Sequence, residues 1–141
     1  ISSLLKETIY QYQRGFDDNH KSLNLNLKDD VVYDGDKGMI RKAFTEIIEN
    51  ALKYSDTYFN VTLEKTDERI VIRFENDSEG IKQGSLDQIF NPFYRLDDKK
   101  NLNYPGSGLG LSVVKEIIES HHGRIKAKGE ENIFKLKMLN Y

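Results

Sequence analysis

The sequence contains no cysteine and no tryptophan, two prolines and three histidines, and its net charge is close to zero. Without cysteine, neither a disulfide framework nor a thiolate zinc site can form. Three scattered histidines argue against a catalytic metal cluster. A formal net charge of −2 at pH 7 gives no general attraction to nucleic acid or anionic lipid, so we expect no nucleic-acid partner.

Long hydrophobic runs are also missing. No apolar segment approaches the ~18 residues that a membrane span needs, and the first residues lack the apolar core of a signal peptide. We therefore expect an intracellular domain, and any membrane-bound part of the parent protein would lie outside this chain. A length of 141 residues is enough for one domain with its own core, so we expect a single domain over residues 1–141.

The spacing of the apolar residues predicts an α+β domain. Helical spacing predicts helices over residues 5–16, 36–54 and 111–118, with a short helix near 85–90, and Asp36 is a plausible N-cap of the second. Alternation predicts strands at 23–27, 31–33, 59–63, 70–74, 124–128 and 133–139. The pattern favours two layers, with helices on one face of a mixed, mostly antiparallel sheet.

A narrow polar stripe runs along the helix predicted over residues 36–54. Glu46 and Asn50 are four residues apart, and Lys53 follows three later, so these side chains share one side of the helix with Lys42. A solvent-exposed helix face explains this stripe when it is considered alone. A magnesium and phosphate site also explains it, because an amide oxygen suits Mg²⁺ and a lysine attracts phosphate.

The segment PGSGLGLSVVKEIIESHHG places a glycine-rich loop directly before an apolar helix. A helix N-terminus offers unpaired N–H groups to an anion, and glycines let that anion approach the backbone. A dinucleotide-binding fingerprint would have to follow a buried strand, but the polar residues RLDDKKNLNYP precede this loop. A phosphate loop and a simple linker with a helix cap both remain open for this loop alone.

Four segments in order resemble the motifs of one family. TEIIENALKYS, FENDSEGI, IFNPFYR and GSGLGLSVVKEIIESHHG are similar to the N box, first glycine box, F box and second glycine box of the sensor histidine kinase catalytic and ATP-binding domain, a member of the Bergerat-fold family. The resemblance covers essentially the whole chain. It implies a two-layer α/β sandwich that binds Mg²⁺ and ATP under a mobile lid at about residues 91–108.

The resemblance also implies roles for individual residues. Asn50 matches the Mg²⁺ ligand, Lys53 a phosphate or ribose contact, and Tyr54 an aromatic border of the nucleotide. Arg95 matches an arginine that reaches the γ-phosphate. The remaining expected nucleotide contacts are Asn76, Asp77, Gly80, Ile81, Phe93, Gly106, Ser107, Gly108, Leu109, Gly110 and Leu111.

The chain departs from the family pattern in its first glycine box. The family's Asp-x-Gly-x-Gly places Asn76 at the aspartate and Ser78 at the first glycine. An asparagine oxygen can still accept a hydrogen bond from the adenine amino group, although without the charge that strengthens it. Asp77 is the alternative if the register differs by one residue. Glu46 stands where ATP-hydrolysing relatives place a general base, and it can instead orient the Mg²⁺ shell or the incoming imidazole.

The implied activity is transfer of the γ-phosphoryl group of ATP to a histidine. The family carries that histidine on an upstream dimerisation domain, which we expect to lie outside this chain, since His20, His121 and His122 lie in turn or helix-end contexts. The resemblance implies a cytoplasmic domain of a membrane-bound bacterial sensor kinase, a downstream response regulator as partner, and a monomeric isolated domain. Alternatives are a nucleotide-gated interaction module, an ATPase that depends on Glu46, and a serine kinase.

Overall fold

The computed structural model describes residues 1–81, 83–92 and 110–140. Its helices are α1 (Ser2–Tyr10), α2 (Gln13–Asp18), α3 (Lys37–Tyr54), the 3-10 turn η1 (Asp87–Phe90) and α5 (Gly110–Ser120). Its strands are β1 (Ser22–Leu27), β2 (Tyr58–Lys65), β3 (Ile70–Asp77), β4 (Gly84–Ser85), β5 (Gly123–Glu130) and β6 (Ile133–Asn140).

The strands form one mixed sheet in the order β1-β2-β3-β6-β5-β4. β1 and β2 are parallel because α3 lies between them in the chain and carries it back across the sheet. The other neighbouring strands are antiparallel, and tight hairpins join β2 to β3 and β5 to β6. The expected mixed, mostly antiparallel sheet is confirmed.

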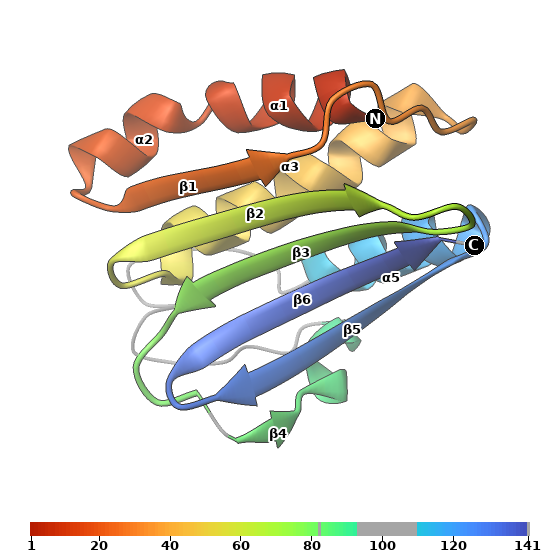
Figure 1. Ribbon diagram of the computed structural model, residues 1–141. Coiled ribbons are helices and arrows are strands. Elements are labelled where there is room, and N and C mark those ends of the chain that lie inside the picture. Colours follow the sequence, from red (N-terminus) through yellow and green to blue (C-terminus); the bar gives the residue numbers. More distant parts are fainter. Residues whose placement is uncertain (82, 93–109, 141) are drawn as a thin grey trace.

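The described helices cover one face of this sheet, and none of them lies on the other face, which we call the open face (Figure 1). α3 and α5 lie behind the sheet in this view, while α1 and α2 lie along the β1 edge. Alternate residues of β2 and β6 are buried beneath the helices, as the period of two predicts. The core includes a run of three aromatic rings from α2, β2 and β3, in which Phe59 stacks between Phe16 and Phe74 with centroids 5.6 and 6.2 Å away.

The orientation of α3 and α5 positions the candidate site. α3 begins where predicted, because the Asp36 carboxylate accepts a hydrogen bond from the Met39 N–H at 3.1 Å. His121, just after α5, accepts a hydrogen bond from the Asp36 N–H at 3.1 Å, and Gly110 at the start of α5 lies beside Glu46 in the middle of α3. The two helices are therefore antiparallel.

The strand predicted at residues 31–33 is wrong. The Val31 carbonyl accepts hydrogen bonds from the Ile1 amino group (2.8 Å) and the Ser2 N–H (3.3 Å), so this backbone is bound to the start of α1. Val31 is buried while Val32 is 77% exposed, which is why the side chains mimic a strand pattern. The two-residue strand β4, which pairs with Lys128 and Gly129, was not predicted because its sequence is too short to alternate.

Candidate functional site

The predicted polar stripe of α3 is present, and it lies between core and solvent. Glu46, Asn50 and Lys53 are half-buried, whereas the apolar side of the same helix is buried against the sheet. The Lys42 ammonium lies 3.6 Å from the Glu46 carboxylate, one helical turn away. Glu46 is 28% exposed against 59% for Lys42, so the stripe is more covered at Glu46 than at Lys42.

Glu46 lies at the N-terminus of α5. A methyl group added at Gly110 would stand 2.6 Å from the Glu46 Oε2 atom, which is closer than atoms pack. A glycine at this position therefore leaves room for the Glu46 carboxylate beside the first turn of α5. Since α5 begins beside Glu46 and the helices are antiparallel, the last turn of α3, which carries Asn50, Lys53 and Tyr54, extends past the start of α5.

Asn76 is the buried polar residue at the end of β3. Its exposed fraction is 4%, and it lies on the same face as Phe74 and Ile72, which is the face that the helices cover. Its Nδ2 donates to the Asp77 carbonyl oxygen at 3.0 Å, and its amide oxygen makes no hydrogen bond to the described residues. An acceptor is therefore held beneath the helices.

The Asp77 side chain lies on the opposite side of β3 from Asn76. Its carboxylate accepts hydrogen bonds from the N–H groups of Thr57 (2.8 Å), Asp56 and Tyr58 (both 3.1 Å), and from the Thr57 hydroxyl. Burial acts to raise the pKa of Asp77, but the hydrogen bonds from Thr57, Tyr58 and Asp56 outweigh it and hold the pKa below its usual value. Asp77 thus fixes the connection between α3 and β2.

The turn after β3 differs from the family's glycine-rich form. Ser78 has an ordinary negative φ, and its N–H donates to the Asn132 carbonyl at 2.8 Å. Gly80 has a φ of +84°, a conformation that favours glycine, and its N–H donates to the Asn132 side chain at 3.2 Å. Serine is therefore accommodated by a different turn. Ile81 is half-buried and packs against the core, as Leu111 does at the start of α5.

Ser55 was missed by the sequence analysis. It is 4% exposed at the C-cap of α3, and its hydroxyl makes no hydrogen bond to the described residues. The next N–H, that of Asp56, donates to the Asp77 carbonyl at 3.0 Å, so the end of α3 lies against the end of β3. A serine after a helix is common, so no signal in the sequence singled it out.

Several predicted residues cannot be compared with the structure. Phe93, Arg95, Gly106, Ser107, Gly108, Leu109 and most of the expected lid lie outside the described residues. The described part brings together α3, the first turn of α5 and, near the end of α3, the end of β3.

The described residues contain no group of three or more acidic or histidine side chains that could hold a metal. Glu46 and Asn50 offer one carboxylate and one amide oxygen within one helical turn. This donor set fits Mg²⁺ bound largely by water and phosphate oxygens, since Mg²⁺ commonly takes only one or two protein ligands. It does not fit a metal held by protein alone.

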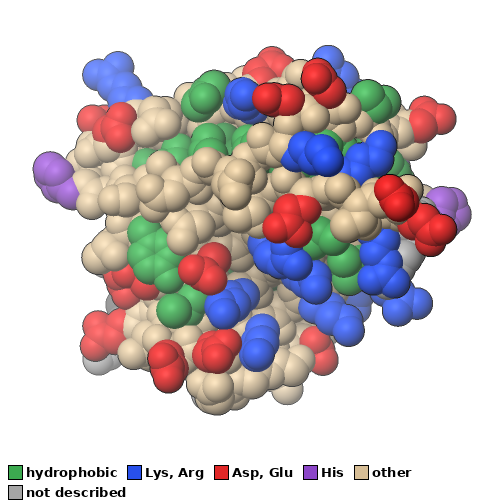
Figure 2. Space-filling view, viewed as in Figure 1, with side chains coloured by type: hydrophobic (Ala, Val, Ile, Leu, Met, Phe, Trp, Pro, Cys, Tyr) green, Lys and Arg blue, Asp and Glu red, His purple; other side chains and the backbone are tan. Residues whose placement is uncertain are grey.

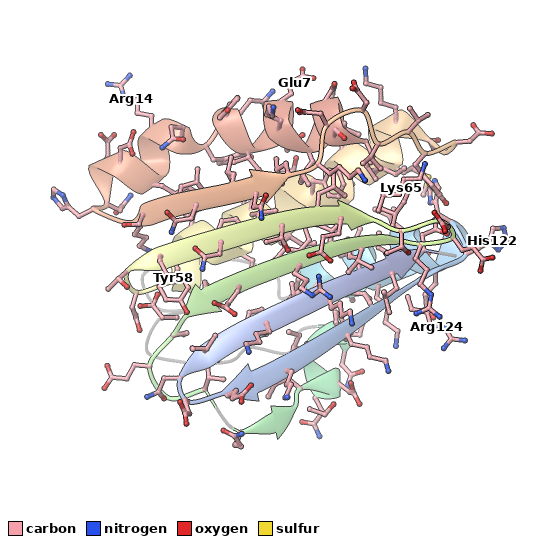
Figure 3. The ribbon with its side chains drawn as sticks, in the orientation of Figure 1. Glu7, Arg14, Tyr58, Lys65, His122 and Arg124 are labelled. Carbon is pink, nitrogen blue, oxygen red and sulfur yellow. The ribbon has the colours of Figure 1, made fainter. Side chains whose placement is uncertain are left out.

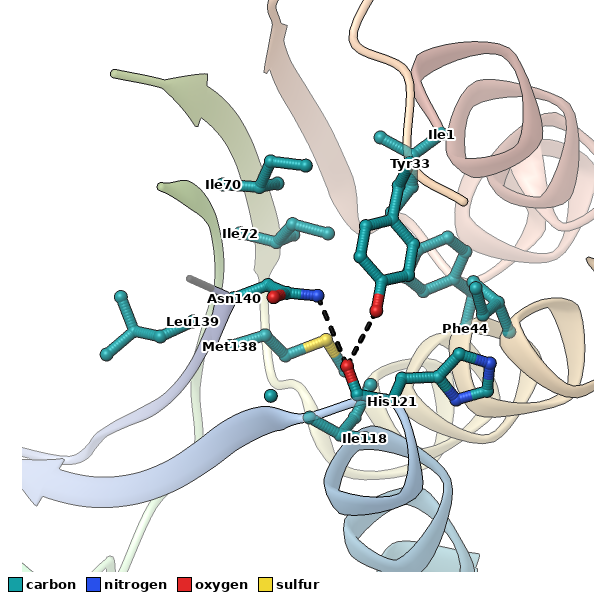
Figure 4. A pocket seen from close by; sticks show the side chains of 12 residues that line it. Ile1, Tyr33, Phe44, Ile70, Ile72, Ile118, His121, Met138, Leu139 and Asn140 are labelled. Carbon is teal, nitrogen blue, oxygen red and sulfur yellow. Dashed lines mark hydrogen bonds between the residues drawn. The ribbon is translucent and has the colours of Figure 1, made fainter. Parts of the chain in front are cut away.

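A separate pocket lies at the other end of α5, near His121 (Figure 4). It has a volume of about 40 Å³, and its lining is mostly apolar, including Ile40, Phe44 and Ile72. The His121 carbonyl at its rim accepts hydrogen bonds from the Tyr33 hydroxyl (2.6 Å) and the Asn140 side chain (3.4 Å). This space is too small for a nucleotide and is part of the core packing.

Comparison with known proteins gives one consistent family. Residues 35–139 match the family described as histidine kinase-, DNA gyrase B-, and HSP90-like ATPase. The chain is 34% identical over 119 residues to the "probable sensor protein" PcoS of Escherichia coli, covering 82% of this chain and 26% of that protein. It is 38% identical over 103 residues to the sensor protein kinase WalK of Staphylococcus aureus, covering 70% and 24%.

Solved structures show the same fold. The catalytic domain of histidine kinase ThkA superposes with a TM-score of 0.82 at 19% identity, covering 99% of this chain and 90% of that one. The chain spans about a quarter of the length of the curated relatives it matches. Among the described residues, no helix combines the length and apolar character that crossing a bilayer requires.

Proposed function

Because the chain belongs to the family of histidine kinase-, DNA gyrase B-, and HSP90-like ATPases, we propose that it is the ATP-binding catalytic domain of a two-component sensor histidine kinase. This membership confirms the family expected from the four ordered motifs, and the sheet confirms the two-layer Bergerat fold. The observation that carries the proposal is that the Glu46 side chain lies beside Gly110 at the start of α5, next to the turn of α3 that bears Asn50.

The adenine base is bound at the end of β3 in this proposal. Asn76 is buried on the helix-covered face, and its amide oxygen, which makes no hydrogen bond to the described residues, can accept from the adenine amino group. Asp77 makes its hydrogen bonds to the backbone of residues 56–58, which supports Asn76 rather than Asp77 as the base contact. The buried Ser55 hydroxyl lies at the neighbouring helix end and can supply a further polar contact.

The phosphates lie between the end of α3 and the start of α5 in this proposal. The N-terminus of α5 attracts anions, and Gly110 has no side chain of its own there, so the mobile Glu46 carboxylate is its neighbour and must move aside for phosphate. Lys53 supplies a positive charge from α3, and Asn50 holds Mg²⁺. Bound Mg²⁺ would neutralise charge on the phosphate oxygens. Gly106, Gly108 and Arg95 are proposed to complete the phosphate contacts on the strength of the family motifs.

The proposed reaction is an in-line displacement. A neutral histidine nitrogen on a separate dimerisation domain attacks the γ-phosphorus, the bond to the β–γ bridging oxygen breaks, and ADP leaves with that electron pair. The neutral imidazole is already nucleophilic near pH 7, so deprotonation by a strong base is not required. Glu46, half-buried and paired with Lys42, orients the groups around Asn50.

Calorimetric titration with a non-hydrolysable ATP analogue tests the binding part of the proposal. We expect Mg²⁺-dependent binding that Asn50→Ala weakens at least tenfold, which is about 1.4 kcal/mol. Asn24→Ala is a matched control, because Asn24 bonds to Asn60 on exposed positions of β1 and β2 and should leave binding unchanged. If the unmutated domain binds no analogue with or without Mg²⁺, the nucleotide site is refuted.

Phosphoryl transfer is tested by adding a histidine-containing dimerisation domain in trans with radiolabelled ATP. Acid-labile label on that domain supports the kinase, and its absence despite ATP binding supports a nucleotide-gated interaction module. An ATPase is the second candidate, because Glu46 is half-buried at the start of α5, where a base could meet water. Steady phosphate release that Glu46→Gln abolishes, without transfer to histidine, would favour hydrolysis.

The same proposal extends to the setting of the domain. We propose that the parent protein is a membrane-bound sensor kinase with this domain in the cytoplasm, that a response regulator receives the phosphoryl group, and that the isolated domain is a monomer. The similarity to sensor proteins such as PcoS and WalK supports this setting.

A further inference from the structure

Four lysines face one another on the open face of the sheet. Lys126 pairs with Lys137 and Lys128 pairs with Lys135 across β5 and β6, and we call these four residues the lysine square. Their neighbours in each strand are buried, so the lysines point to the side that none of the described helices covers. Figure 2 shows Lys and Arg side chains gathered over these strands.

The register of this hairpin is fixed by its turn. Glu131 and Asn132 form the two-residue loop, with φ values of +50° and +63°, which is the conformation of the tight hairpin turns that match sheet twist. A slip of one residue would bury the lysines, so the lysine square is enforced by the fold. Arg73 on β3 lies opposite Lys137 and extends the row of cations to three strands.

The positive charges in this square are only partly balanced. Lys135 lies 3.2 Å from Glu130 and 3.9 Å from Glu75, Lys128 lies 3.7 Å from Glu130, and Arg73 pairs with Glu64 at 2.7 Å. Lys126 and Lys137 have no carboxylate within ion-pair distance in the part of the chain that the structure describes. Like charges directly across neighbouring strands destabilise a sheet, so the Lys126–Lys137 pair destabilises the fold when no anion is bound to it.

The open face is hollowed where these lysines stand. A groove of about 550 Å³ is lined by the lysine square and Arg73, with Ser85 and Asp87 at one side. A groove of this size can be filled by a segment of a partner protein, whereas the flat surface of a lipid bilayer would not fill it. Glu64, Glu75, Glu130 and Asp87 stand among the cations, so the unbalanced positive charge is concentrated at Lys126 and Lys137. This small area suits a few carboxylates better than a continuous polyanion such as a nucleic acid.

We propose that this groove binds an acidic segment of a partner protein, whose carboxylates sit over Lys126, Lys137 and Arg73. The cations of this row stand about 5 Å apart, the spacing of adjacent strands. Carboxylates on consecutive turns of a helix are separated by a similar distance, so an acidic helix face matches the row. The groove lies on the opposite face of the sheet from Asn76, so the proposal does not depend on nucleotide binding.

Fluorescence anisotropy with a labelled helical peptide tests the proposal. The probe is an alanine-rich peptide that carries Glu at positions i, i+4 and i+8 on one side, and the control peptide carries Gln at those positions. The Glu peptide should bind the 141-residue chain, and added salt should weaken the binding. The double variant Lys126→Ala, Lys137→Ala should lower its affinity at least tenfold.

A matched double variant controls for the loss of charge. Lys6→Ala with Arg14→Ala removes the same charge from α1 and α2, where Arg14 points into solvent (Figure 3). It should leave peptide binding unchanged, and both double variants should retain the parent's circular dichroism. The proposal is overturned if the Glu peptide does not bind, if both double variants lose equal affinity, or if single-stranded DNA or anionic vesicles bind the groove more tightly than the peptide.

Discussion

At the scale of single residues, a substitution at Gly110 should affect nucleotide affinity much more than the stability of the fold. Gly110→Ala adds a methyl group 2.6 Å from the mobile end of the Glu46 side chain, which can rotate away. Alanine also favours helix formation, so we expect the free energy of unfolding to change by less than about 1 kcal/mol. ATP-analogue affinity should nevertheless fall about tenfold, because the displaced carboxylate and the new methyl group crowd the phosphates. Calorimetry and thermal unfolding of the same variant measure both effects.

A double-mutant cycle identifies the cause. If the Glu46 carboxylate is what the methyl group displaces, Gly110→Ala should cost less affinity in a Glu46→Ala background than in the parent. Equal losses in both backgrounds would instead place the conflict between the methyl group and the nucleotide. Unchanged affinity in the parent background would contradict the prediction.

Asp77 gives the domain a predicted acid sensitivity. Hydrogen bonds from Thr57, Tyr58 and Asp56 lower its pKa in the folded state despite the opposing effect of burial. A lowered folded-state pKa stabilises the fold above the unfolded pKa of about 4, and this contribution is lost as the pH falls through the folded value. Asp77→Asn should therefore lower the free energy of unfolding by about 1–2 kcal/mol at pH 7.

The pH dependence of urea unfolding checks this prediction. The difference between Asp77→Asn and the parent should shrink as the pH falls from about 4 through the lowered folded-state pKa of Asp77, below which both side chains are neutral. Asp67→Asn is the control, because Asp67 is exposed in the hairpin turn between β2 and β3. A difference for Asp77→Asn that stays constant down to pH 2 would show that charge is not its cause.

At the scale of secondary-structure elements, two adjacent histidines at the end of α5 have opposite effects. His121 accepts from the Asp36 N–H at 3.1 Å, and its Nδ1 lies 2.8 Å from the Ile117 carbonyl, so it ties α5 to the start of α3. His122 is exposed with a φ of +64°, and Figure 3 shows it at the end of the molecule. Of these two histidines, only His121 links the two helices.

We expect His121→Ala to lower the free energy of unfolding by about 1–2 kcal/mol, because the Asp36 N–H loses its partner. His122→Gly should raise it by about 1 kcal/mol, because glycine adopts a positive φ without steric cost. Urea unfolding of both variants at pH 7.5 measures these changes. If both variants change the free energy of unfolding in the same direction, the separate roles of His121 and His122 are refuted.

At the scale of the whole molecule, one hydrophobic core extends from α1 to β6. Such a core favours a single cooperative unfolding transition, with the same midpoint by far-ultraviolet circular dichroism and by tyrosine absorbance. Because the proposed site draws on α3, β3 and α5, a bound nucleotide should raise that one midpoint. At a hundred times the dissociation constant the gain is about 2.7 kcal/mol, or roughly 10 °C for a domain of this size.

Differential scanning calorimetry with ADP and Mg²⁺ provides this measurement. Asn50→Ala should reduce the shift at the same ligand concentration, while its midpoint without ligand should remain near that of the parent, since Asn50 is only half-buried. Two separated transitions, or a shift confined to one probe, would contradict a single cooperative unit.

The sequence by itself determined the elements and their family. Apolar periodicity located α3, the β2–β3 hairpin and the closing hairpin, and Asp36 marked the start of α3 by its capping chemistry. These features are local, because they depend on residues a few positions apart. The order of the four motifs identified the family for the same reason, since motif order is a property of the chain.

Only the tertiary structure decided which way adjacent side chains face and which groups they contact. Asn76 and Asp77 are adjacent, yet the pleat of β3 turns one toward the helices and the other toward residues 56–58. The backbone around Val31 bonds to the start of α1, which no local pattern could reveal. The facing lysines of β5 and β6 likewise depend on a register set by the turn between them, because contacts between distant residues exist only after the chain has folded.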